Sequence, residues 1–151
     1  MKISKILQSV IDTTQIIDFV SECKNLGVNI NKYQNKKTNE IEIPFEVQSV
    51  ILAKCIVHNI NNACYKVAQQ AGNVWIFNLN NWVMIDKSDW KRFLLDCSSK
   101  MNKDISIILT HKFQKYLLHD IFVILDLFRT FKRDDSKIII NCNNGTLNIS
   151  N

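Results

Sequence analysis

Glycine and proline are scarce in this 151-residue chain, which contains three glycines and one proline. Because the glycines stand far apart, at positions 27, 72 and 145, no glycine-rich loop can cradle a phosphate, and the P-loop pattern G-x-x-x-x-G-K-[ST] is missing. The patterns H-E-x-x-H and G-x-S-x-G are missing as well. ATPases and hydrolases of these types are therefore excluded. The low content of both residues also argues against a disordered or fibrous chain.

Cysteine pairs and long hydrophobic runs are also missing. The five cysteines form no C-x-x-C pair, so a zinc site is not expected. An odd, widely spaced set without a signal peptide predicts reduced thiols in the cytoplasm of a bacterial or host cell. No run approaches the ~20 apolar residues of a membrane span. We expect a soluble protein that needs no metal or other cofactor and does not bind membranes. The cysteines are Cys23, Cys55, Cys64, Cys97 and Cys142.

The hydrophobic content and the net charge narrow the class of protein. A chain of this length with 46% hydrophobic residues fits one domain, or a domain with a small appendage. Its formal net charge is +5. Such a charge can attract phosphate backbones, but it can equally serve only to keep a small protein soluble.

The first 30 residues are predicted to form an N-terminal helical segment, followed by a loop or linker over residues 31–43. Asp12 is expected to cap a second helical stretch, with Gln15 as its capping-box partner, and Gly27 is expected to end it. Residues 44–151 are predicted to form an α+β body that opens with a helix. The apolar residues that recur at helical spacing near the N-terminus are Ile3, Ile6, Leu7 and Val10.

The body is predicted to alternate between strands and helices. Residues 65–67, 74–77 and 82–85 favour a β-meander with a turn near Gly72-Asn73. Helices are expected from about residue 87 and over residues 110–129, and an Asn144-Gly145 turn indicates a final hairpin. The predicted fold class is α+β: N-terminal helices, a small antiparallel meander, two further helices and a C-terminal hairpin. The last helices and the hairpin could form a winged-helix-like unit.

No catalytic constellation is found, so the chain is not expected to be an enzyme. His111 and His119 would lie about two helical turns apart, too far to share one metal ion without other ligands. The acidic residues show no pairing on strands.

Aromatic and basic residues are the candidates for binding nucleic acid. Trp75 and Trp82 could stack on single-stranded bases, although tryptophans in a meander more commonly pack it against the following helix. The basic residues could contact phosphates, with a solvated helix face as the alternative. The basic candidates are Lys87, Lys91, Arg92, Lys112, Lys115, Arg129, Lys132 and Arg133.

Two segments, residues 73–86 (NVWIFNLNNWVMID) and residues 138–149 (IIINCNNGTLNI), resemble a known family. They are similar to the region that precedes the superfamily 3 helicase domain in poxvirus-type primase–helicases and their phage and plasmid relatives. The helicase and primase motifs themselves are missing, so no catalytic residue can be transferred.

The resemblance implies a non-catalytic accessory domain of a viral, phage or plasmid DNA replication protein. Such a domain would bind DNA, assist a replicative helicase or self-associate. The alternative hypothesis is a small viral factor that binds a host protein, suggested by the small size and by the wide apolar stripe of the helix expected over residues 110–129.

Overall fold

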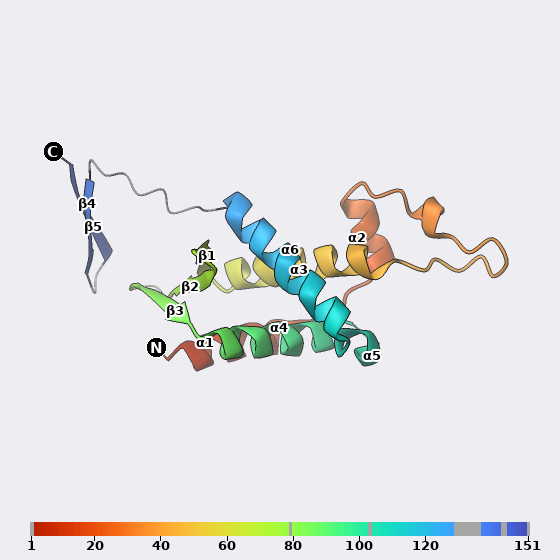
Figure 1. Ribbon diagram of the computed structural model, residues 1–151, viewed down its shortest axis with the longest axis horizontal. Coiled ribbons are helices and arrows are strands. Elements are labelled where there is room, and N and C mark those ends of the chain that lie inside the picture. The colour runs from red at the N-terminus through yellow and green to blue at the C-terminus, as the bar shows by residue number, and fades with distance from the viewer. Residues whose placement is uncertain (1, 79, 103, 129–136, 143–144, 151) are drawn as a thin grey trace.

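The computed structural model describes residues 2–78, 80–102, 104–128, 137–142 and 145–150, with side chains described as far as Leu125. Helices dominate and a three-stranded antiparallel sheet lies among them (Figure 1), so the predicted α+β class is confirmed. The helices are α1 (Ile3–Thr13), α2 (Phe19–Asn25), η1 (Ile30–Tyr33), α3 (Phe45–Asn62), α4 (Lys87–Met101), α5 (Ile105–Ile108) and α6 (His111–Phe128). The strands are β1 (Lys66–Gln70), β2 (Asn73–Phe77), β3 (Trp82–Ile85), β4 (Lys137–Cys142) and β5 (Gly145–Ser150).

The N-terminal segment forms two separate helices, and the predicted role of Asp12 is wrong. Asp12 lies inside α1, where its carboxylate accepts a hydrogen bond from Gln8. The chain then runs extended to Asp18, whose carboxylate accepts the N–H of Val20 and caps α2. Gly27, at a φ of +69°, follows α2 as predicted, because the N–H groups of residues 27 and 28 turn back to the last carbonyls of the helix.

The long helices α3 and α6 pack against each other and build much of the core. Both helices bury apolar side chains along the facing sides. Between them the buried Ser49 hydroxyl donates to the Asp120 carboxylate at 2.5 Å. The fully buried side chains of the pair include Leu52, Ile56, Ile60, Phe113, Leu117 and Ile121.

Strands β1, β2 and β3 form the predicted meander, in that order. Its first turn is Ala71-Gly72, one residue earlier than expected, since Gln70 pairs with Asn73 across a two-residue loop. Both turn residues have positive φ, the geometry of a type I′ hairpin turn. The second turn is held by Asn78, whose side-chain oxygen accepts the N–H groups of Asn80 and Asn81.

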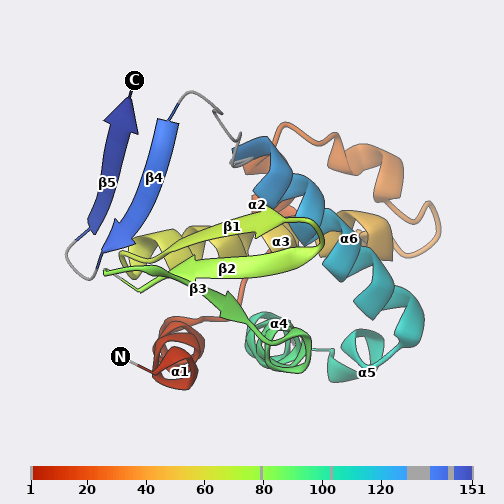
Figure 2. The same ribbon diagram turned by 60° about the vertical axis from the view of Figure 1, so that its left-hand side comes forward.

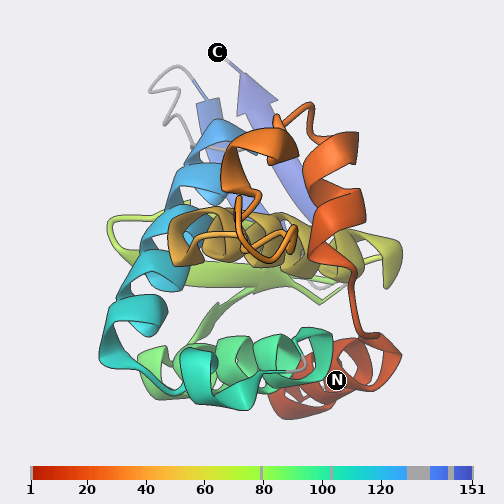
Figure 3. The ribbon, with the colours of Figure 1, turned by 90° about the vertical axis from the view of Figure 1, so that its right-hand side faces the viewer.

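The sheet lies across α3 and above α4 (Figure 2), and Figure 3 shows it between these two helices. Helix α4 begins after Asp86, which caps it by accepting the N–H of Ser88. Helix α1 packs along α4 and buries its apolar side in the same core. Apolar residues at helical spacing form the buried face of α4: Trp90, Phe93, Leu94, Cys97 and Met101.

The C-terminal hairpin pairs β4 with β5 in antiparallel register, with Ile138 opposite Ile149 and Cys142 opposite Gly145. The first residue of the predicted Asn144-Gly145 turn lies outside the described residues. The winged-helix-like arrangement stays a prediction.

Candidate nucleic-acid interface

The two faces of the three-stranded sheet differ sharply in their side chains. The side chains of directly opposite residues on paired strands point to the same face of the sheet. The register therefore assigns each side chain to one of the two faces. The inner face carries apolar residues that join the core, such as Val67, Val74, Ile76 and Ile85. The other face, here called the outer face, carries residues Lys66, Ala68, Gln70, Asn73, Trp75, Phe77, Trp82 and Met84.

Aromatic side chains dominate this face on the central strand β2 and the edge strand β3. Trp75 lies opposite Met84, and Phe77 lies opposite Trp82, with ring centres 5.5 Å apart. All three rings are partly exposed, and Met84 is 50% exposed. Apolar side chains of this size usually become buried when they are free to do so. Ala68 of β1 is fully buried on this face, so its exposed part consists of Lys66 and Gln70 at the two ends of β1 and of the residues of β2 and β3.

The three tryptophans have separate roles. Trp90 is 3% exposed and stacks on Phe93 of the same helix, with ring centres 5.2 Å apart, and it belongs to the same core cluster as Val74 and Ile76 of the sheet. Trp75 and Trp82 instead share the outer face. Trp90 is thus part of the core, whereas Trp75 and Trp82 are partly exposed on the outer face, and their stacking role stays a prediction.

A positive charge lies on the outer face itself. Lys66 is directly opposite Phe77 and is exposed. Lys87 and Lys91 are exposed on α4, one helical turn apart. Lys87 is the first residue of that helix and follows β3 closely in the sequence. Lys66 thus belongs to the outer face, at the end of the sheet where β3 starts, whereas Lys87 and Lys91 belong to α4, which follows the end of β3.

The remaining described candidates lie elsewhere. Arg92 faces the groove between α1 and α4 and lies 3.9 Å from the carboxylate of Asp96. Lys115 is exposed on α6. Arg129, Lys132 and Arg133 lie outside the described residues. The basic candidates therefore do not form one continuous patch among the described residues.

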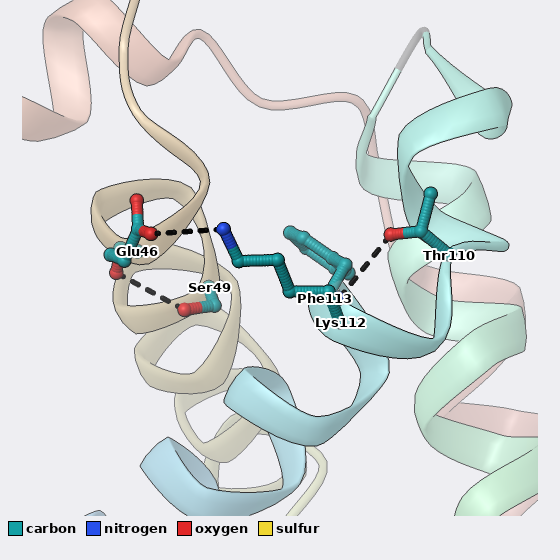
Figure 4. A network of polar contacts seen from close by, with 5 residues as sticks. All are labelled: Glu46, Ser49, Thr110, Lys112 and Phe113. Carbon is teal, nitrogen blue, oxygen red and sulfur yellow. Dashed lines mark hydrogen bonds and ion pairs between the residues drawn. The ribbon is translucent and has the colours of Figure 1, made fainter.

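Lys112 has an acidic partner at the start of α6. Its ammonium lies 3.8 Å from the Glu46 carboxylate of α3, next to the turn where Thr110 accepts the N–H of Phe113 (Figure 4). Such an exposed ion pair contributes little to stability, but it partly neutralises the charge. Among the described residues no carboxylate pairs with Lys66 in this way, so the ion pair distinguishes Lys112 from Lys66.

A polar pocket between α2 and α3 is the best candidate for chemistry. Cys55, His58 and Glu22 line it, together with Lys54 and Asn59. Burial, helped by the negative charge of Glu22, raises the pKa of the Cys55 thiol to about 11. A thiol with so high a pKa is neutral at physiological pH and is a poor nucleophile. The pocket therefore does not support cysteine-based catalysis.

Within the described ranges, no three His, Cys, Asp or Glu side chains come close enough to hold a metal ion. In the same part of the chain, no helix is both long and apolar enough to cross a bilayer. The cysteines described, residues 23, 55, 64 and 97, are free thiols.

Comparison of the chain with protein-family models, with curated proteins and with solved structures finds no match.

Sequence reasoning missed Lys66 and Met84 as parts of the surface. A strand pattern shows which residues alternate, but the pairing register decides which residues of neighbouring strands share a face. The sequence does show aliphatic Val74 and Ile76 alternating with aromatic Trp75 and Phe77. This alternation could have indicated that β2 has one buried face and one aromatic face.

Proposed function

We propose that this chain is a non-catalytic accessory domain of a viral, phage or plasmid DNA replication protein, and that its outer face binds DNA. The observation that carries the proposal is the cluster of partly exposed aromatic rings next to Lys66 on one face of the sheet. Rings beside positive charge are the combination by which proteins hold nucleic acid strands, through stacking and phosphate contacts. The net charge of +5 favours the same ligand.

The resemblance supports the replication context. Its first segment, residues 73–86, spans β2, β3 and the cap of α4, and so supplies the aromatic residues of the outer face.

The experiment that tests this function is the titration of labelled oligonucleotides at low and at physiological salt. We expect binding at low salt that weakens steeply as salt is added, because each released counterion contributes to affinity. Replacing Lys66 with glutamate should weaken binding and lower the slope of log K against log salt by about one, as for the loss of one phosphate contact. Failure to bind any oligonucleotide at low salt would refute the proposal.

The matched control is Lys36→Glu. Lys36 is exposed in the loop between η1 and α3, away from the sheet (Figure 1), and the substitution changes the net charge by the same amount. Equal losses for Lys66→Glu and Lys36→Glu would mean that only the overall charge matters and would contradict a binding role of the outer face.

The apolar end of the molecule around α5 favours the second candidate, a factor that binds another protein. Phe45 is 37% exposed, Ile105 53% and Leu109 64%. Phe45 also borders an open groove of about 560 Å³, whose lining is partly apolar (Ile41, Ile43, Pro44 and Ile107) and partly polar (Glu42, Glu46, Gln48 and Lys112). Exposed apolar groups gathered at one site are typical of protein interaction surfaces, and such a surface could equally serve helicase assembly.

Leu109→Lys tests this second candidate, with Met84→Lys as the control because it places the same charge at an exposed apolar site of the outer face. A partner captured by the original protein and by Met84→Lys, but lost with Leu109→Lys, would support protein binding through the α5 end. Equal capture by all three proteins would exclude it.

A further inference from the structure

We infer that the outer face selects single-stranded over double-stranded nucleic acid, and that it does so by stacking unpaired bases on Trp75, Phe77 and Trp82. This inference rests on the proposed DNA-binding function and adds the form of the ligand. Three features of the face carry it: the spacing of the rings, the chemistry of the exposed part of Trp75, and the small number of cations.

The rings are spaced for separate bases. Trp75 and Phe77 are two residues apart on β2, a distance of about 6.7 Å along a strand. The Trp82 ring of β3 contacts the Phe77 ring, with ring centres 5.5 Å apart and a tilt of 49°, so these two rings form one stacking position beside Trp75. A flexible single strand can place successive bases over such rings. In a duplex the flat faces of the bases are already stacked on one another and cannot reach them.

Trp75 offers its carbon surface rather than its polar group. The residue is partly exposed, yet its indole nitrogen is buried and has no hydrogen-bond partner. The part of the ring that faces solvent therefore cannot donate a hydrogen bond to a base edge, and stacking is what it can contribute. Because every base has an aromatic face, recognition of this kind tolerates any sequence.

The charge of the outer face is too small to hold a duplex by its backbone. Among the described residues of this face, Lys66 is the one cation. Duplex DNA presents mainly phosphates, and affinity for it comes largely from the number of phosphates neutralised. A face with three rings and one lysine gains more from unpaired bases than from a second negatively charged strand.

The test compares a labelled single-stranded oligonucleotide of mixed sequence with the duplex of the same sequence, using Trp75→Leu and Trp82→Leu with Trp75→Phe and Trp82→Phe as matched controls. Leucine keeps an apolar side chain in the strand but removes the ring, whereas phenylalanine keeps a ring. We expect the original protein to bind the single strand at least ten-fold more tightly than the duplex. Each leucine variant should lose about ten-fold in single-strand affinity, and each phenylalanine variant should retain most of it.

A second measurement does not depend on how the variants fold. Tryptophan fluorescence of the original protein should be quenched by the single strand, since stacked bases cover Trp75 and Trp82, and Trp90 provides the emission that remains because it is buried. The duplex should quench it far less at equal saturation.

Equal affinity for both forms, or unchanged single-strand affinity in folded leucine variants, would overturn the inference while leaving salt-dependent DNA binding intact. A dimer seen by light scattering that dissociates in Trp82→Leu would also overturn it, because a second copy would then cover the face. Failure to bind either form would refute the DNA-binding function as well.

Discussion

Ala71 occupies a backbone conformation that its side chain disfavours. Its φ is +49°, and it forms the type I′ turn between β1 and β2 together with Gly72, whose φ is +74°. The left-handed region costs an ordinary residue about 1–2 kcal/mol, while asparagine and glycine enter it more easily. The pairing of β1 with β2 requires this turn geometry, and it holds Ala71 in the unfavourable conformation.

Replacing Ala71 with asparagine should stabilise the protein by about 0.5–1 kcal/mol, because it creates the Asn-Gly pair that type I′ turns prefer. Ala71 is exposed, so the new amide stays in water. Urea unfolding measures the change. Gly72→Ala should instead destabilise the protein by about 1 kcal/mol. A Cβ there would meet no atom within 4 Å, so only the backbone would resist. A destabilised Ala71→Asn protein would contradict this account.

At the scale of the element, helix caps decide where α2 and α4 begin. Asp86 and Asp18 each accept the N–H two residues ahead, and each lies before a short hydroxyl-bearing side chain that donates to it as well. Hydrogen bonds from the Ser88 hydroxyl and N–H keep the pKa of Asp86 below its ordinary value. The ionised carboxylate is therefore the form that stabilises α4.

Asp86→Ala should lower the melting temperature at neutral pH by a few degrees, whereas Asp86→Asn, which still accepts a hydrogen bond, should lower it less. Because the folded pKa is depressed, the contribution of the charge is complete well above the ordinary value of 3.8 and is lost as pH falls below it. The difference between the original protein and Asp86→Asn should therefore shrink between neutral pH and about pH 3, followed by circular dichroism. A difference that does not depend on pH would show that the charge is unimportant.

At the scale of the whole molecule, α1 belongs to the same core as the body. Ile6 and Val10 are fully buried, and they belong to one apolar cluster with Ile60 and Trp90. The Lys100 ammonium of α4 also donates to the Ile11 carbonyl at 3.0 Å. These contacts tie the first helix of the chain to elements 50 or more residues away in sequence.

Ile6→Ala should cost about 2–5 kcal/mol and should destabilise the whole protein in one step, because it leaves a cavity in the shared core. Unfolding in urea would be followed by circular dichroism and by tryptophan fluorescence, and the two curves should coincide. Ile16→Ala is the control, since Ile16 is 61% exposed and should change stability by no more than about 0.5 kcal/mol. Separate transitions for the two signals would contradict a single core.

Periodic patterns placed most elements correctly from the sequence. Apolar residues of α4 and α6 recur at helical spacing in the sequence, and those that form the two faces, such as Phe93 and Cys97 of α4 and Leu117 of α6, are buried. The β-meander was placed because short β-rich runs were separated by turn residues. The short helix α5 was missed, since a single turn is too short to show a period. The cap of α2 was predicted at Asp12 instead of Asp18, because both are aspartates that can accept a backbone N–H at the start of a helix.

The sequence by itself determined the α+β class and the faces of the long helices, because these follow from local spacing and from burial of apolar side chains. Only the tertiary structure decided which tryptophans are core and which are surface. Trp75, Trp82 and Trp90 have the same chemistry, yet the strand register turns two of them outward and helix α4 turns the third inward. That register arises from hydrogen bonds between strands, and from which face of the sheet meets α3 and α4, and neither is visible in the spacing of one segment.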